Sequence, residues 1–213
     1  QQVDSLNDYI RKYAEKHQAP LFRHGLNWTI QPHEEGMIYQ DMQGQIILPL
    51  PALIGDHQIL NAGNAIAALR QMPEFKVSPA QMAQGLLQAE HPGRMECLYA
   101  PEKTDGSEPD IDVWFDGGHN VGGAMAIADI VKDWRDKPLY LICGTTRGKQ
   151  VADMLAPFKG LVESVIGVGV KAEPNAYTCQ TIADAAASLG IPTSVGEDVR
   201  SAISTIAASG KPA

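Results

Sequence analysis

The strongest constraint on the fold is the alternation of short apolar runs with helix-like runs after residue 96. Strand-like runs bounded by turn residues are each followed by a run with apolar residues at helical spacing. This alternation is typical of right-handed βαβ units, which place their strands in one mostly parallel sheet with helices on its faces. We therefore predict an α/β fold with strands at 97–100, 113–115, 139–143, 164–168 and 193–195, and helices at 122–134, 151–161, 180–189 and 198–208.

The first ninety residues carry a different pattern. Apolar residues at helical spacing between positions 3 and 18 predict a helix whose apolar stripe packs inward. Short extended stretches between 21 and 48, separated by glycine-containing turns, indicate small antiparallel strands. Helices are expected from about residue 58 and, after a serine-proline start signal, up to about residue 89. A Pro-Gly turn then marks a junction, so we expect domains at residues 1–90 and 91–213.

Composition and charge argue against several classes of function. The net charge of −8 argues against a general nucleic-acid surface, which needs basic residues to displace counterions. No apolar run approaches the roughly 20 residues that span a bilayer, and the polar start is no signal peptide, so we expect a cytoplasmic protein with no membrane partner. The three cysteines form no CxxC pair, and the spacing of the first three histidines matches no metal motif. We therefore expect buried, reduced thiols and no metal ligands in this chain. We also expect a monomeric protein.

Polar and flexible residues follow the predicted strand at 113–115. The sequence there is Asp116-Gly117-Gly118-His119-Asn120, and a predicted helix begins shortly after it. In open α/β sheets, ligands bind beyond the carboxyl ends of the strands, beside helix N-termini. Glycines at such a place let a ligand approach the backbone closely. The same residues also fit a plain turn with a helix cap, and their spacing alone leaves both interpretations open.

Two other places carry polar residues that need an explanation. Asn61 and Asn64 lie inside an alanine-rich helix, although amide side chains compete there with backbone hydrogen bonds, so one of them is expected to have a function. Arg94 follows the Pro-Gly turn. Before any further information, Arg94 is either a solvated surface charge or an anion-binding residue.

Four features in fixed order resemble the folylpolyglutamate synthase and dihydrofolate synthase family, within the Mur ligase superfamily. They are Gly-Asp-His-Gln-Ile-Leu-Asn-Ala at 55–62, Pro-Gly-Arg at 92–94, Asp-Gly-Gly-His-Asn at 116–120, and Gly144 with the basic loop after it. The resemblance covers nearly the whole chain and implies the end of a central ATPase domain followed by a Rossmann-like C-terminal domain. It also implies that ATP, with Mg²⁺, activates a dihydropteroate or folate carboxylate as an acyl phosphate, which the amine of glutamate then attacks.

The resemblance also assigns roles to four residues. Asn61 is expected to reach the adenine of ATP. Arg94 is expected to contact an ATP phosphate, for which the guanidinium fork is well suited. Asp116 is expected to hold the ribose hydroxyls, and His119 to lie near the phosphates and the incoming amino acid. All four would bind the nucleotide, and Arg94 and His119 are the expected catalytic residues.

The sequence also departs from the family pattern. Val121 replaces the usual proline after the His-Asn pair, and Lys149 lacks the two acidic neighbours of the family loop. The chain has no Gly-x-x-x-x-Gly-Lys-Ser/Thr phosphate loop, so we expect it to be part of a longer enzyme, inactive by itself, whose Mg²⁺ ligands lie in the other part. Two alternatives stay open: another member of the superfamily, such as a peptidoglycan-precursor ligase, and a non-catalytic Rossmann-like binding module.

Overall fold

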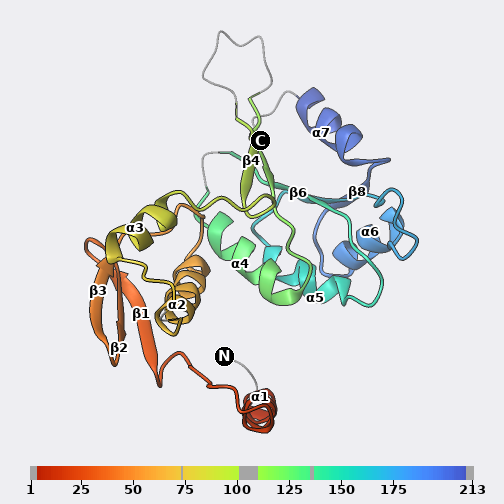
Figure 1. Ribbon diagram of the computed structural model, residues 1–213. Helices are drawn as coiled ribbons and strands as arrows, with labels where there is room; N and C mark the ends of the chain where they lie inside the picture. The colour runs from red at the N-terminus through yellow and green to blue at the C-terminus, as the bar shows by residue number, and fades with distance from the viewer. Residues whose placement is uncertain (1–3, 73, 101–109, 135–136, 210–213) are drawn as a thin grey trace. The chain divides into compact units, whose positions relative to one another are not determined.

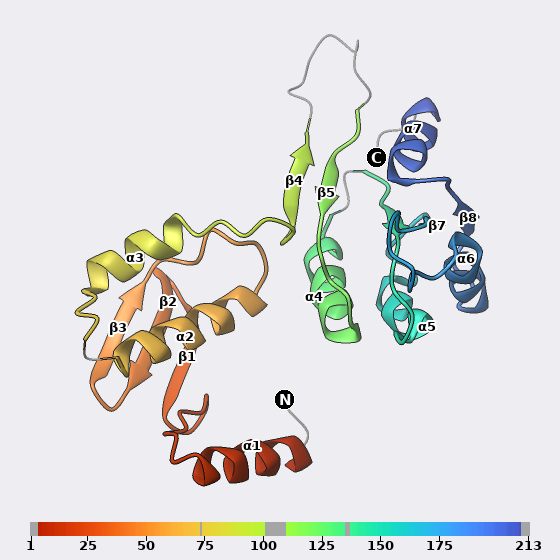
Figure 2. The ribbon, with the colours of Figure 1, turned by 45° about the vertical axis from the view of Figure 1, so that its right-hand side comes forward.

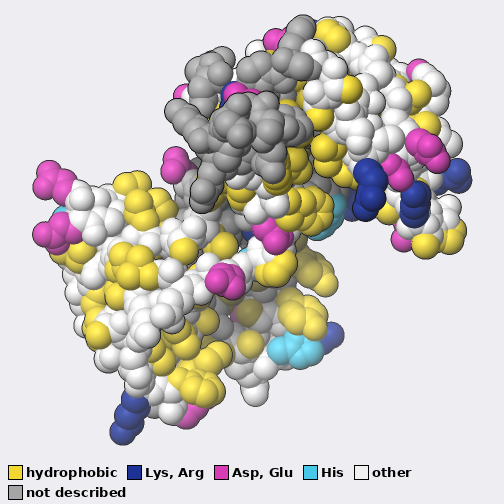
Figure 3. Space-filling model, turned by 90° about the horizontal axis from the view of Figure 1, so that it is seen from above, with side chains coloured by type: hydrophobic (Ala, Val, Ile, Leu, Met, Phe, Trp, Pro, Cys, Tyr) yellow, Lys and Arg dark blue, Asp and Glu magenta, His cyan; other side chains and the backbone are white. Residues whose placement is uncertain are grey.

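The computed structural model describes residues 4–72, 74–100, 110–134 and 137–209 (Figure 1). The chain divides into two compact units, the first made of Gln1–Ala52 and Asp56–Glu90, the second of Leu53–Gly55 and His91–Ala213. Within the described residues, no helix has both the length and the apolar character needed to cross a membrane. On the face drawn in Figure 3, Lys and Arg side chains stand among acidic and neutral ones, in keeping with the net charge of −8.

An antiparallel sheet forms the centre of the first unit. Its strands, in spatial order, are β1 (Trp28–His33), β2 (Gly36–Asp41) and β3 (Gly44–Leu48). Side chains alternate across a strand. Ile30 pairs with Tyr39, and Tyr39 pairs with Ile46, so these residues share one face of the sheet. Trp28, Met37 and Tyr39 on this face are at most 3% exposed, which makes it the core side.

Two helices complete the core of the first unit. Helix α2 (His57–Arg70) contributes Ala62, Ile66 and Ala67 to the cluster that contains the buried sheet residues. Helix α3 (Pro79–Leu87) contributes Met82 and begins at a capping box, in which Ser78 and Gln81 exchange hydrogen bonds. The predicted helix starts of this region are therefore found in the structure, as are the strands expected at 27–30, 37–39 and 45–48. The expectation of a further strand at 21–22 was wrong, because these two residues pair with no strand of the sheet.

Helix α1 (Asp4–Lys16) forms where a helix was expected, but its apolar stripe does not pack inward. Leu6, Tyr9 and Tyr13 are 43%, 64% and 54% exposed. The aromatic rings contact one another along the helix instead, with centroids 6.1 Å apart for Tyr9 and Tyr13. The expectation of an inward stripe was wrong because periodicity identifies an apolar face without supplying the surface that covers it.

A parallel sheet forms the centre of the second unit (Figure 2). Its strands lie in the order β6 (Tyr140–Cys143), β7 (Ser164–Gly167) and β8 (Thr193–Val195). Helix α5 (Val151–Leu155), with a 3₁₀ turn (Ala156–Phe158), connects β6 to β7, and helix α6 (Cys179–Ser188) connects β7 to β8. Helix α7 (Val199–Ala208) follows β8. Val165 packs in the core with α5 and α6, while the next residue, Ile166, packs with Ala202 of α7. Helices thus cover both faces, and the predicted α/β class is confirmed.

A second, two-stranded sheet leads into the candidate site. Strands β4 (Glu96–Tyr99) and β5 (Val113–Phe115) pair antiparallel, with a register shift between Cys97 and Tyr99. Alternation predicted both strands but placed them in the mostly parallel sheet, which was wrong, because they form an antiparallel sheet of their own. The expectation of buried thiols was also wrong for Cys97 of β4, which is exposed. The predicted polar insert at 102–110 lies, apart from Asp110, outside the described residues. Because Glu96 pairs with Phe115, the residues before β4 lie beside the residues after β5.

Candidate functional site

Two loops of the second unit are joined by backbone and side-chain hydrogen bonds. One loop contains the Pro-Gly-Arg turn at 92–94 and the other the Asp-Gly-Gly-His-Asn sequence at 116–120. The backbone N–H of Gly117 donates to the carbonyl oxygen of Gly93 at 2.8 Å. The antiparallel pairing of β4 with β5 therefore brings together Arg94, Asp116 and His119, three of the four residues predicted to form the site.

The carboxylate of Asp116 links these two loops through hydrogen bonds. Its Oδ2 accepts a hydrogen bond from the backbone N–H of Met95 at 2.9 Å, and its Oδ1 accepts one from Gly118 at 2.6 Å. The side chain is 15% exposed. A carboxylate that accepts backbone N–H groups fixes the loop conformation before any ligand arrives. Asp116 was expected to hold ribose hydroxyls, and the structure adds this anchoring contact to that expectation.

The guanidinium of Arg94 is partly exposed and only loosely paired with Asp116. Its Nη1 lies 3.9 Å from Asp116 Oδ1, beyond hydrogen-bond distance, and the side chain is 39% exposed. Within the described part of the chain, the guanidinium makes no hydrogen bond. An arginine held loosely by one carboxylate can turn its donors toward a phosphate or carboxylate, to which the planar fork binds in a bidentate manner.

The loop at 116–120 runs directly into helix α4 (Val121–Val131). Asn120 is the N-cap, with Oδ1 accepting from the backbone N–H of Gly123 at 2.9 Å. A Cβ on Gly118 would lie 2.9 Å from Ile127 Cδ1 and 3.0 Å from Asp116 Oδ1, so the loop backbone passes close to both side chains here. The N-terminus of α4 carries the partial positive charge that favours anions. The cap interpretation and the ligand interpretation of this stretch are thus compatible.

His119 lies exposed on the same loop. Its Nδ1 is 3.1 Å from the carbonyl oxygen of Gly117. A carbonyl only accepts, so this contact requires the proton on Nδ1 and leaves Nε2 as the acceptor of a neutral ring. His119 can therefore accept a proton or a hydrogen bond from a ligand through Nε2.

Asn61 lies in the first unit, on the exposed side of α2. Its Nδ2 donates to Oε1 of the buried Gln58 at 3.0 Å, and Gln58 Nε2 is 3.0 Å from His57 Nε2. With its Nδ2 donating to Gln58, the Asn61 side chain is oriented in a way that leaves its carbonyl oxygen as an acceptor. An amide oxygen of this kind suits the exocyclic amino group of an adenine.

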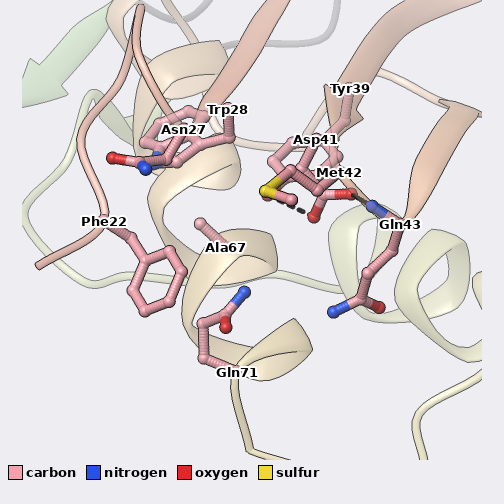
Figure 4. Close-up of a pocket in the computed structure, with 9 residues that line it drawn as sticks. All are labelled: Phe22, Asn27, Trp28, Tyr39, Asp41, Met42, Gln43, Ala67 and Gln71. Atoms are coloured by element: carbon pink, nitrogen blue, oxygen red, sulfur yellow. Dashed lines mark hydrogen bonds between the residues drawn. The ribbon is translucent and has the colours of Figure 1, made fainter. Parts of the chain in front are cut away.

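A cavity of about 120 Å³ in the first unit does not involve the predicted residues (Figure 4). At its floor Asp41 accepts two hydrogen bonds from Arg70, at 2.8 and 2.9 Å, and one from the Tyr39 hydroxyl at 3.2 Å. Burial alone would raise the pKa of Asp41, but Arg70 and the backbone N–H of Gln43 outweigh it, so the pKa is lowered. Because the carboxylate is already satisfied by these donors, we assign the cluster a structural role.

Sequence reasoning missed two residues of the site. Met95 is 5% exposed and has φ of 44°, a left-handed conformation that non-glycine residues rarely adopt. Glu96 accepts a hydrogen bond from the backbone N–H of Gly93. Nothing in the sequence marks Met95, whereas an acidic residue three positions after the turn glycine is a signal for a side chain that closes the turn. No group of His, Cys, Asp and Glu side chains suited to a metal occurs among the described residues.

The fold and the site define an α/β domain with a glycine-rich loop at the N-terminus of α4 and, beside this loop, the guanidinium of Arg94, which lies 3.9 Å from Asp116. Residues 93–212 match the glutamate ligase domain of the Mur ligases. This match covers more than half of the chain, so the chain belongs to the Mur ligase family. The superfamily predicted from the four motifs is confirmed.

Three known proteins illustrate the similarity. Folylpolyglutamate synthase of Lacticaseibacillus casei is 28% identical over 142 residues, which are 65% of this chain and 31% of that protein. E. coli FolC in complex with DHPP and ADP has a TM-score of 0.79 at 24% identity, covering 96% of this chain and 45% of that one. A bifunctional folylpolyglutamate synthase/dihydrofolate synthase with Mn, AMPPNP and L-glutamate bound has a TM-score of 0.80 at 20% identity, covering 96% and 46%. The chain spans less than half the length of each.

Proposed function

We propose that the protein acts in ATP-dependent ligation of L-glutamate to dihydropteroate or folate through an acyl phosphate. The observation that carries this proposal is the arrangement of Arg94 beside the glycine-rich loop at the N-terminus of α4, within a Mur ligase glutamate ligase domain. Two relatives support the choice of substrates, since one is named folylpolyglutamate synthase and another was solved with L-glutamate and an ATP analogue. The proposal favours a folate ligase over a peptidoglycan-precursor ligase or a binding module.

In this proposal each predicted residue meets one demand of phosphoryl transfer. Arg94 binds a phosphate oxygen and stabilises the negative charge that develops there. His119, with Nε2 as acceptor, lies near the phosphates and receives a proton or hydrogen bond from the incoming amine. Asp116 accepts hydrogen bonds from the ribose hydroxyls with lone pairs that its backbone partners leave free. Asn61 binds the adenine.

We propose Mg²⁺ as the ion that accompanies ATP, by analogy with the Mn in a related structure. The described residues do not form a metal site, so we assign no step to the ion in this part of the protein.

A monomeric, cytoplasmic enzyme remains part of the proposal. Lys149, whose carbonyl oxygen accepts from the Tyr177 hydroxyl at 3.2 Å, has no assigned role.

The test uses the full-length protein with Mg²⁺, ATP, labelled L-glutamate and either dihydropteroate or folate. We expect label to enter the pterin product only when ATP is present, with ADP and phosphate released in equal amounts. With hydroxylamine in place of glutamate, an acyl phosphate is expected to give a hydroxamate of the pterin acid. Incorporation only with a muramoyl-peptide acceptor would favour the peptidoglycan branch, and nucleotide binding without turnover would favour a binding module.

A further inference from the structure

The turn that carries Arg94 is closed by a side chain that has no assigned role. Oε2 of Glu96, the first residue of β4, accepts a hydrogen bond from the backbone N–H of Gly93 at 2.8 Å. The same turn contains a bond from the backbone N–H of Arg94 to the carbonyl oxygen of His91 at 3.2 Å. Pro92 and Gly93, with φ of 72° at the glycine, occupy the positions that proline and glycine favour in a type II turn.

Both polar backbone groups of Gly93 are therefore used. Its N–H is bound by Glu96, and its carbonyl oxygen accepts from Gly117 of the other loop. On the other side of Arg94, the N–H of Met95 is held by Asp116. The residues before and after Arg94 are thus each fixed by one carboxylate, while the guanidinium itself stays loosely bound. This arrangement fixes the backbone on both sides of Arg94, while the guanidinium makes no hydrogen bond among the described residues and is 39% exposed.

We infer that Glu96 is a positioning residue for Arg94, an inference that rests on the proposed function. Among the described residues, Glu96 forms no hydrogen bond or ion pair with the guanidinium of Arg94. It acts through the Gly93 N–H, which sets the turn from which Arg94 leaves the backbone. A misplacement of a binding group by about 1 Å can lower a rate by about 100-fold, so the loss of one turn-closing bond is expected to affect the chemical step.

An acceptor role and a charge role make opposite predictions for Glu96→Gln and Glu96→Asp, and the same prediction for Glu96→Ala. Glu96→Gln keeps an acceptor oxygen at the same distance and removes the charge. Glu96→Asp keeps the charge and shortens the side chain by one methylene, so the oxygen no longer reaches Gly93. Glu96→Ala removes both. The exposed Glu163 of the same unit, changed to Ala, is the matched control.

The measurements are steady-state kinetics of the full-length enzyme, and hydrogen exchange of the peptide that contains residues 91–96. We expect kcat to fall about 10- to 100-fold in Glu96→Ala and Glu96→Asp, and to stay within about threefold in Glu96→Gln. Faster exchange of the peptide is expected in Glu96→Ala and Glu96→Asp but not in Glu96→Gln. The Glu163→Ala control should match the wild type in both measurements. A merely structural role would lower the melting temperature without this ranking of kcat.

Two results would overturn the inference. One is a Glu96→Gln enzyme as slow as Glu96→Ala, which would indicate that charge is needed. The other is an exchange rate in Glu96→Ala equal to that of the wild type, whatever the activity. Failure of the proposed function is distinguishable, because it would appear as absent glutamate transfer in the wild-type enzyme, whereas exchange ranks the variants without turnover.

Discussion

The backbone N–H of Met95 donates a 2.9 Å hydrogen bond to Asp116, although the two residues are 21 positions apart. Met95 has φ of 44° and is 5% exposed, so an unfavourable backbone conformation is held inside the core of the second unit. Such a conformation persists only where surrounding contacts determine it. The Asp116 carboxylate supplies one of these contacts and thereby links the Arg94 turn to the loop before α4.

Replacing Asp116 is therefore expected to reduce stability as well as ligand binding. Asp116→Ala leaves the N–H groups of Met95 and Gly118 without their acceptor, and we expect the free energy of unfolding to fall by about 2 to 4 kcal/mol. Asp116→Asn retains one acceptor oxygen, so its free energy of unfolding should fall by about half as much. Urea unfolding measures both variants, and Asp129→Ala, at a largely exposed carboxylate, is the control with an expected change below about 0.5 kcal/mol. An Asp116→Ala protein as stable as the control would contradict the anchoring role.

The same glycine-to-alanine change is expected to have opposite effects on two helices of the first unit. A Cβ on Gly85 of α3 meets nothing within 4 Å, so alanine should raise the free energy of unfolding by about 0.5 to 1 kcal/mol through its lower conformational entropy cost. A Cβ on Gly63 of α2 would lie 2.6 Å from Trp28 and 2.8 Å from Ile30. In Gly63→Ala, overpacking should therefore lower the free energy of unfolding by about 1 to 3 kcal/mol. Thermal or urea unfolding compares the two variants, and a gain in stability for Gly63→Ala would show that helix propensity, not packing, decides at Gly63.

The sequence predicted most elements of the fold because hydrophobic periodicity reports which face of each segment is buried. It did not predict that β4 and β5 pair antiparallel, since an apolar run carries no information about the direction of its neighbour. The exposed stripe of α1 illustrates the same limit, because Tyr9 and Tyr13 define a face but not its partner.

The candidate site was predictable in part. Asp116 and His119 follow a strand and precede a helix, which made them candidates for a ligand site while leaving a plain turn and cap open. Their strand, β5, pairs antiparallel with β4 and lies outside the parallel sheet on which that argument depends. The resemblance added Arg94 and Asn61. The contacts that hold the site together, from Met95 to Asp116 and from Gly93 to Glu96, depend on backbone conformations and on the register of two strands. These quantities follow from tertiary packing and not from local residue preference.

The buried Tyr39 hydroxyl should make stability depend on alkaline pH. Burial and the charge of Asp41 raise the pKa of Tyr39 to about 12, above the usual value near 10. Tyr39 ionises at a lower pH in the unfolded chain than in the folded protein. The contribution of the neutral Tyr39 hydroxyl to stability is therefore complete below pH 10 and is lost as the pH rises from 10 to 12. The Tyr39→Phe variant has no hydroxyl group that could ionise at this position. We expect the wild type to lose about 2 kcal/mol more unfolding free energy than Tyr39→Phe over this range, measured by urea unfolding at pH 9 and pH 12, and parallel losses would refute the assignment.

The kinetic role of Arg94 can be separated from any structural role because its guanidinium makes no hydrogen bond within the described residues and lies 3.9 Å from Asp116. Arg94→Ala should therefore change the free energy of unfolding by less than about 1 kcal/mol. In the full-length enzyme we expect kcat to fall by an order of magnitude or more, since losing one electrostatic contact to developing charge costs roughly 2 to 4 kcal/mol.

Arg94→Lys should recover only part of this rate, because an ammonium group cannot reproduce the bidentate fork of the guanidinium. Arg200→Ala, at an exposed arginine of the same unit, is the control and should leave both kinetic parameters unchanged. Steady-state kinetics with ATP as the varied substrate separate the effect on kcat from the effect on KM. A rise in KM for ATP with kcat unchanged would mean that Arg94 binds the ground state and the transition state equally. Wild-type kinetics in a folded Arg94→Ala enzyme would make Arg94 a surface charge, and the assignment of the phosphate site to this turn would then be wrong.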